Sequence, residues 1–288
     1  MVVLSSAMFG TVPFFAVSLT KAGLAPHGIA FYRYLIAAVV FLPALWQARA
    51  QWRILMWGLM AGAMMGAGWI GYVEALKLAP VSTVGVIYMT YPVFTLLVGW
   101  LVFRDIPSAR GLLAAAIVVV AAVLASAPAA VGAGQAKALI FALAAPLGFG
   151  LAINVLVHRL VEVAPLARVG SVSLGAMLGI LPLILMSSRN EMIPADPAYW
   201  WLIVGIALGS ALVPQMLYTV FAPRIGAGRT AMAGSIELPT MFAIGWFAFG
   251  EQIGVAQWLA CGLIVLAIVM VPARATRNVT TNLTTDIP

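Results

Sequence analysis

The chain is poor in charged residues. Of its 288 residues only 8% are Asp, Glu, Lys or Arg, whereas 64% are hydrophobic. An ordinary soluble domain is about one quarter charged, so these side chains are too few to cover a water-exposed surface. Apolar runs of about 20 residues, the length that crosses the hydrocarbon core of a bilayer, recur along the whole chain. The composition excludes a soluble globular protein and indicates a polytopic membrane protein.

Cysteine and histidine are also scarce. The single cysteine, Cys261, excludes an intrachain disulfide and a thiolate cluster. The two histidines, His27 and His158, occur without an HExxH or CxxC pattern, so no metal site is expected. The sequence also lacks a GxSxG motif, an acidic metal-binding cluster and a P-loop, which argues against an intramembrane enzyme and against direct ATP drive. We therefore expect no enzymatic activity and no cofactor.

What charge there is has a net value of +7. The basic residues lie in short connections between apolar runs rather than in one patch, so we expect no nucleic-acid partner. Their distribution fits the positive-inside rule if the N-terminus is cytoplasmic. The cytoplasmic side then receives Arg49, Arg53, Arg104, Arg110, Arg159, Arg168, Arg224, Arg229, Arg274 and Arg277, against Lys21, Lys77, Lys137 and Arg189 outside. We expect a multi-pass protein of a bacterial inner membrane, with both termini in the cytoplasm.

The apolar runs predict an all-α polytopic membrane protein with ten transmembrane helices. Helices are expected because every backbone N–H and C=O group in lipid must find a partner within its own segment. A polar cytoplasmic tail is predicted at 273–288. The expected spans are 3–20, 28–47, 54–76, 81–102, 109–127, 136–157, 167–187, 199–221, 229–249 and 254–272.

The second half of the chain repeats features of the first. GWLVFRD (Gly99–Asp105) matches GWFAFGE (Gly245–Glu251) at an offset of 146, and Ala25-Pro26 matches Ala164-Pro165 at an offset of 139. The series predicts two five-helix repeats, 1–128 and 136–272. Because five is odd, the second repeat is expected to be inverted in the membrane, an architecture typical of secondary transporters. A duplicated scaffold without transport activity is the alternative.

Several of these segments carry a resemblance to a known family. They are FYRYLIAAVVFLP (Phe31–Pro43), GYVEALKLAPVSTVGVIYMTYPVF (Gly71–Phe94), GWLVFRD and IELPTMFAIGWFAFGE (Ile236–Glu251). The chain resembles the EamA-type permeases of the drug/metabolite transporter superfamily over nearly its whole length. The resemblance implies a ten-helix exporter or facilitator of small metabolites, with a cavity lined mainly by helices 1, 3, 4, 6, 8 and 9. Asp105 stands where Glu is usual, and Glu237 lies one residue farther from Pro239 than in the common pattern.

Two prolines lie at corresponding places in the fourth and ninth expected spans. Pro92 and Pro239 have no N–H group to donate, so each should free a backbone carbonyl one turn earlier and bend its helix. A free carbonyl at mid-membrane needs a cavity, a water molecule or a side chain to satisfy it. We predict that both prolines are hinge or cavity-lining residues. Simple kinking is the alternative.

The candidate substrate-binding residues are polar or aromatic side chains near these prolines. Glu237 stands out because an ionisable group inside a span is costly and marks a functional site by default; a structural Glu is the alternative. It corresponds to Tyr91 at an offset of 146, or to Thr90 if the prolines set the register. Arg33 is expected to snorkel toward the outer membrane surface. The full set is Trp69, Tyr72, Tyr88, Tyr91, Gln215, Tyr218 and Glu237, of which the aromatic members have a lipid-facing position as the alternative.

Aromatic residues around one acid suit a neutral, zwitterionic or cationic amphipathic solute. A phosphorylated substrate would need Lys or Arg in the cavity, and only Arg33 lies within a span. We therefore expect a secondary transporter that exports small metabolites, with amino acids, including aromatic ones, as the best fit. Efflux of cationic drug-like or polyamine-like compounds is one alternative; a non-transporting scaffold and an intramembrane enzyme are others. The expected partners are a small-molecule substrate and the lipid bilayer, and nothing in the sequence indicates an oligomeric state.

Overall fold

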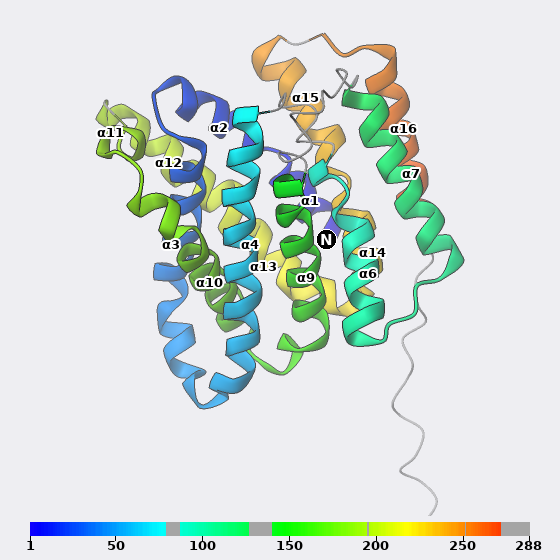
Figure 1. Cartoon of the computed structure of the whole chain (residues 1–288), viewed down its shortest axis with the longest axis horizontal. Helices are drawn as coiled ribbons and strands as arrows, with labels where there is room; N and C mark the ends of the chain where they lie inside the picture. The colour runs from blue at the N-terminus through cyan, green and yellow to red at the C-terminus, as the bar shows by residue number, and fades with distance from the viewer. Residues whose placement is uncertain (79–86, 127–139, 195, 251, 272–288) are drawn as a thin grey trace, which may run out of the picture.

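The computed structural model describes residues 1–78, 87–126, 140–194, 196–250 and 252–271. The secondary structure of these residues is helical throughout, and the helices run up and down one bundle (Figure 1). Seven helical segments are long and apolar enough to cross a membrane, and three shorter apolar helices accompany them. The predicted cytoplasmic tail, 273–288, lies outside the described residues. The expected class, an all-helical multi-pass membrane protein, is confirmed.

The helices of the first half follow the expected spans to within a few residues. The fourth expected span begins at residue 81, and the structure describes it from residue 87 onward. The elements are α1 (Val2–Phe9), α2 (Val12–Lys21), α3 (Pro26–Gln47), η1 (Arg49–Gln51), α4 (Trp52–Leu78), α6 (Tyr91–Phe103) and α7 (Ala109–Ser126).

The second half follows the same order with more interruptions. The connection after the seventh span holds two short helices, α11 and η4, where we expected only a loop. The elements are α9 (Ala144–His158), η3 (Leu160–Glu162), α10 (Pro165–Leu185), α11 (Arg189–Met192), η4 (Pro197–Tyr199), α12 (Trp200–Ala207), η5 (Leu208–Leu212), α13 (Val213–Ile225), α14 (Ala227–Gly234), α15 (Glu237–Phe249) and α16 (Val255–Met270).

Several spans are interrupted near their middle instead of being continuous. The first span breaks at Gly10, the eighth contains the π-helical turn η5, and the ninth breaks at Ser235 and Ile236. Pro92 and Pro239 lie in the first turns of α6 and α15. A first turn requires no N–H donor from its residues, so each proline starts a helix. The two spans are interrupted directly before these helices, at residues 89–90 and 235–236, and the hinge or cavity-lining role of the prolines stays a prediction.

Corresponding connections of the two halves lie at opposite ends of the bundle (Figure 1). The α6–α7 connection is at the lower end of the view and the α15–α16 connection at the upper end. The two helices before these connections match in detail. Both α6 and α15 contain 13 residues, and each ends in a residue with left-handed backbone, Arg104 (φ 57°) and Gly250 (φ 68°). Helix starts and ends both differ by 146 positions, so Glu237 corresponds to Tyr91.

The centre of the bundle is held by close helix packing through small residues. Helix α10 packs along α3 and α4, α9 packs between α4 and α6, and α7 packs on α16. Between α4 and α10, a side chain at Gly62 would collide with the carbonyl of Val172, and one at Gly175 with that of Leu59. The backbones approach this closely only because glycine has no Cβ, the usual device of packed membrane helices.

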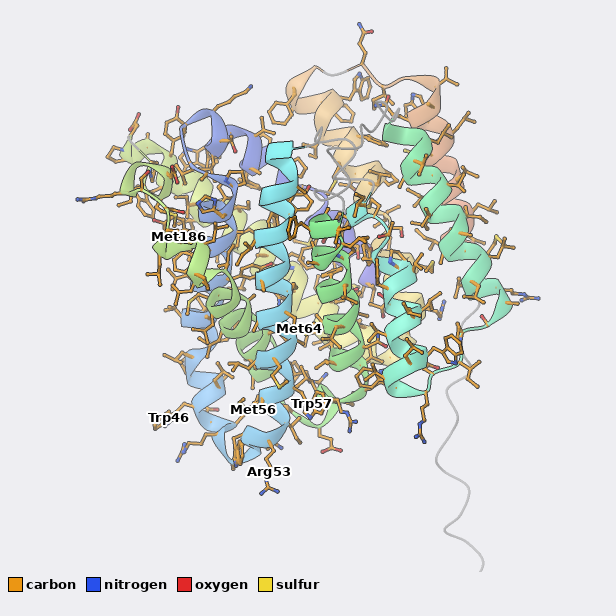
Figure 2. All side chains as sticks on the ribbon, in the orientation of Figure 1. Trp46, Arg53, Met56, Trp57, Met64 and Met186 are labelled. Atoms are coloured by element: carbon orange, nitrogen blue, oxygen red, sulfur yellow. The ribbon has the colours of Figure 1, made fainter. Side chains whose placement is uncertain are left out.

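The outer surface is apolar. Trp46 is 69% exposed and Met186 is 85% exposed, and both lie at the periphery in Figure 2. Met56, Met64 and Trp57 are further exposed apolar residues of α4. A soluble monomer rarely shows so continuous an apolar surface, whereas lipid chains would cover it in a membrane.

Candidate functional site

Three of the interrupted spans meet at one place inside the bundle. The hydroxyls of Thr11, just after the break in the first span, and Ser210, in η5, are hydrogen-bonded at 2.7 Å. A Cβ added to Gly10 would lie 2.5 Å from the Cβ of Thr240 and 2.9 Å from the backbone oxygen of Glu237. The first span therefore touches both the π-helical turn and the start of α15.

Glu237 lies at this junction as the first residue of α15, and it is only 4% exposed. The positive end of the α15 helix dipole favours a carboxylate at that position. Electrostatic interactions link the carboxyl to Arg33 and to three tyrosines that come from different spans: Tyr88, Tyr91 and Tyr218.

Aromatic rings form a row that leads to this acid. Ring centroids are 5.3 Å apart for Trp69 and Tyr72, 6.2 Å for Tyr72 and Tyr88, and 5.9 Å for Tyr88 and Tyr91. Four of the seven predicted binding residues are thus neighbours in one row. Phe149 of α9 closes the row at 4.9 Å from Tyr91, and we did not predict it. A lone Phe in an apolar span carries no signal that separates a site from a lipid contact.

Tyr91 makes structural contacts at the end of this row. Its side chain is fully buried, and its hydroxyl donates to the carbonyl oxygen of Ala231 at 3.3 Å. The hydroxyl also fills the space beside Gly234, where a side chain would collide with it. Tyr91 therefore fastens α6 to α14 directly before the acid. Its neighbour Pro92 is buried, whereas Pro239 is partly buried.

Gln215 and Tyr218 approach the junction from α13. Tyr218 is 6% exposed and packs edge-on against Phe9 at 6.0 Å between ring centroids. Among the described residues its hydroxyl has no hydrogen-bond partner. Gln215 is partly buried on the same helix, one turn earlier. Tyr88 and Tyr91 of the aromatic row, and Tyr218 from α13, are therefore the aromatic residues in electrostatic contact with Glu237.

Arg33 points into the bundle and does not snorkel. Its Nη2 donates to the carbonyl oxygen of Ser210 at 3.3 Å, and its Nε is buried without a partner among the described residues. Our snorkelling expectation is wrong because the π-helical turn η5 approaches α3 and offers a backbone acceptor there. Next to Arg33, the Tyr34 hydroxyl accepts a hydrogen bond from Trp69 Nε1 at 3.2 Å. Arg33 thus joins the candidate site as a residue that sequence reasoning placed elsewhere.

A cavity of about 340 Å³ lies near this junction, toward the end of the bundle that carries Arg224 and Arg229. Its lining includes Phe221, one helical turn after Tyr218 in α13, and Ala233, which lies in α14 just before the break that precedes Glu237. A second cavity, of about 200 Å³, lies beside it between α6, α9 and the α13–α14 connection. Within the described residues no group of three His, Cys, Asp or Glu could hold a metal ion.

The family follows from comparison with known proteins. A model described as "EamA-like transporter family" matches residues 1–127 and again residues 136–272. The chain belongs to the EamA-like transporter family. Its members are transporters of small substrates and not enzymes, and the double match gives the chain two EamA repeats.

One solved structure supports the fold of this EamA-like protein. That structure, described as "Crystal structure of protein", matches over 93% of this chain and 94% of its own length, with a TM-score of 0.74 at 16% sequence identity. The likeness concerns the fold alone. No curated protein matches the chain.

Proposed function

We propose that this protein is a secondary transporter that exports amino acids, including aromatic ones, through the site around Glu237. The observation that carries the proposal is one buried acid where three interrupted spans meet, in electrostatic contact with tyrosines of other spans. Interrupted spans place polar backbone and side chains at mid-membrane, which is where secondary transporters bind their substrates. A buried ionisable residue inside a span also argues against a scaffold without transport.

The mechanism we propose is alternating access by two inverted repeats. The opposite placement of the α6–α7 and α15–α16 connections supports it (Figure 1). So do two contacts at the ends of these helices: Phe103 stacks on His158 at 4.8 Å, and Lys21 lies over the Phe249 ring at 5.6 Å. Phe103 and Phe249 correspond at the offset of 146. We infer that these contacts close the two entrances of the transport path in turn.

The cavity of about 340 Å³ is the inward-facing entrance in this proposal. Its arginines, Arg224 and Arg229, belong to the set that the positive-inside rule assigns to the cytoplasm. A substrate leaving the cytoplasm would pass these arginines, reach the site beside Tyr218 and leave by the Lys21–Phe249 end. The protein would then lie in a bacterial inner membrane with its N- and C-termini in the cytoplasm.

Efflux of cationic drugs or polyamines suits the site less well. A dication would bind close to the inward-pointing Arg33, and two like charges in a low-dielectric interior repel each other strongly. Arg33 favours a substrate that also carries a negative group.

Counterflow into liposomes tests the proposal. Purified protein is reconstituted into vesicles loaded with unlabelled phenylalanine, and the entry of labelled phenylalanine is followed. Saturable counterflow is expected, and Glu237→Gln should lower it about tenfold or more, since contacts to charged groups contribute about 1.5–3 kcal/mol. Glu162→Gln, at an exposed position, is the matched control. No counterflow across a panel of amino acids, or full activity of Glu237→Gln, would contradict the proposal.

A further inference from the structure

Arg33 and Glu237 are ionisable side chains of opposite sign in the same part of the bundle, Arg33 partly buried and Glu237 buried. They interact electrostatically but form no direct ion pair among the residues that the structure describes. Charged groups removed from water normally pair directly, because an unpaired buried charge is very costly. Here each is held near a different interrupted span, Arg33 at η5 and Glu237 at the start of α15.

Arg33 is only partly satisfied where it lies. One of its nitrogen atoms, Nη2, is hydrogen-bonded to a backbone carbonyl, whereas Nε is buried without a partner among the described residues. A guanidinium presents its donors in a planar fork that matches the two oxygens of a carboxylate. Together, these observations indicate an unfilled place for an anionic group.

Glu237 has the complementary surroundings. Tyr88 and Tyr218 both interact electrostatically with the carboxyl, and the Tyr218 hydroxyl lacks a partner in the described part of the chain. A carboxylate beside aromatic faces is a suitable place for an ammonium group, which gains both ion pairing and cation–π contact. Arg33 is the basic group of the described residues that interacts electrostatically with this acid.

We propose that Arg33 binds the carboxylate and Glu237 the ammonium group of a zwitterionic substrate, so that the site selects α-amino acids by both charges. The proposal rests on the proposed transport function and adds its recognition chemistry. The aromatic row of Trp69, Tyr72 and Tyr88 would receive the apolar side chain, because Tyr88 interacts electrostatically with both Arg33 and Glu237.

Competition by three compounds with the same ring tests the selection in the unaltered protein. Phenylalanine carries both charges, phenethylamine only the ammonium group and 3-phenylpropionate only the carboxylate. Each is added to the counterflow assay, and separately to purified protein in detergent, where binding raises the unfolding temperature. Phenylalanine should compete about 10- to 100-fold better than either analogue, the loss expected for one charged contact. Equal competition by phenethylamine would show that Arg33 takes no part.

Substitutions assign each charge to its residue. Arg33→Gln should weaken phenylalanine binding about 10- to 100-fold and leave phenethylamine binding unchanged. Glu237→Gln should leave the binding of 3-phenylpropionate unchanged. Arg33→Lys keeps the charge but loses the fork, so it should restore part of the affinity. Arg53→Gln, at the exposed end of α4, is the matched control.

The outcomes separate this inference from the proposed function. If wild-type protein carries phenylalanine but Arg33→Gln weakens all three compounds equally, or none, the inference fails and the transport function stands. If no amino acid is bound or carried by the wild type, the proposed function fails, and the inference with it. Should Arg33→Gln not fold, the competition in wild-type protein still decides, because the requirement for both charges is measured there without any substitution.

Discussion

At the scale of single residues, the structure separates arginines that the sequence treats alike. The positive-inside rule counted Arg168 with the cytoplasmic arginines. The structure buries it to 8% exposure and directs its guanidinium at the carbonyl oxygens of Val161, Val163 and Thr219. The last of these bonds links the start of α10 to α13. The Arg168 side chain therefore joins two helices, whereas Arg53 is exposed and lies over the ring of its neighbour Trp52.

Removing this link should destabilise the protein. Arg168→Ala leaves three backbone carbonyls without their charged donor. A hydrogen bond to a charged group contributes about 1.5–3 kcal/mol to stability. We expect the free energy of unfolding to fall by about 2–4 kcal/mol, the range for breaking a buried network. Thermal unfolding in detergent measures the change. Arg53→Ala is the control, and an equal small effect for both variants would show that the network contributes little.

Two tyrosine hydroxyls should respond in opposite ways to removal. The Tyr91 hydroxyl donates to Ala231, so Tyr91→Phe should lower the free energy of unfolding by about 1 kcal/mol. The Tyr218 hydroxyl has no partner among the described residues, so Tyr218→Phe should leave stability unchanged or raise it by up to about 1 kcal/mol. If the substrate satisfies this hydroxyl, Tyr218→Phe should also raise the concentration for half-maximal counterflow about 2- to 10-fold. A stability loss in Tyr218→Phe with normal transport would contradict this assignment.

At the scale of the helices, the sequence predicts positions well and interruptions badly. Helices α3 and α10 begin at Pro26 and Pro165, because an Ala-Pro pair sets the backbone for a first turn. The break at Gly10 and the π-helical turn at Ser210 are each followed by a proline in the first turn of the next helix, Pro13 in α2 and Pro214 in α13, and we did not use this signal. Both interruptions also lie where the first span contacts α15 and α13, a tertiary contact that periodicity does not encode.

The same reason explains which site residues were foreseen. Glu237 was evident because an acid inside an apolar run is costly wherever it lies. Arg33 takes part in the site because α3 is rotated so that this side chain faces η5. The position of a residue along a helix does not predict the rotation of that helix about its axis. Phe149 contacts Tyr91 through the packing of α9 on α6, which is visible only in the assembled bundle.

The contact between α4 and α10 should tolerate no added side chain at its glycines. A Cβ at Gly62 would collide with the backbone of Val172 and Ala176, whereas one at Gly262 in α16 meets nothing within 4 Å. We expect Gly62→Ala to lower the free energy of unfolding by about 1–3 kcal/mol, as overpacking does. Gly262→Ala should be neutral or stabilise by up to about 1 kcal/mol, because alanine is the better helix former. Thermal unfolding of the two variants, side by side, measures the difference, and similar melting temperatures would contradict it.

At the scale of the whole molecule, the inverted arrangement that we propose makes a prediction about sidedness. The connection from α3 to α4 and the connection from α10 to α12 occupy the same place in the two repeats, yet they lie at opposite ends of the bundle (Figure 1). Arg53 lies at the first end (Figure 2), and Met186, which is 85% exposed, begins the second connection as the residue that follows α10. Parallel repeats would place both on one side of the membrane.

Cysteine labelling decides this. The single native cysteine is replaced in Cys261→Ser, and Arg53→Cys or Met186→Cys is added to that background. A membrane-impermeant maleimide applied to intact spheroplasts should label Met186→Cys, and Arg53→Cys only after the membrane is opened, because the arginine-rich end is expected in the cytoplasm. Labelling of both from outside, or of neither, would reject the inverted topology. Labelling of Arg53→Cys alone would keep the inversion but reverse the orientation, and with it the direction in which the cavity beside Arg224 and Arg229 faces.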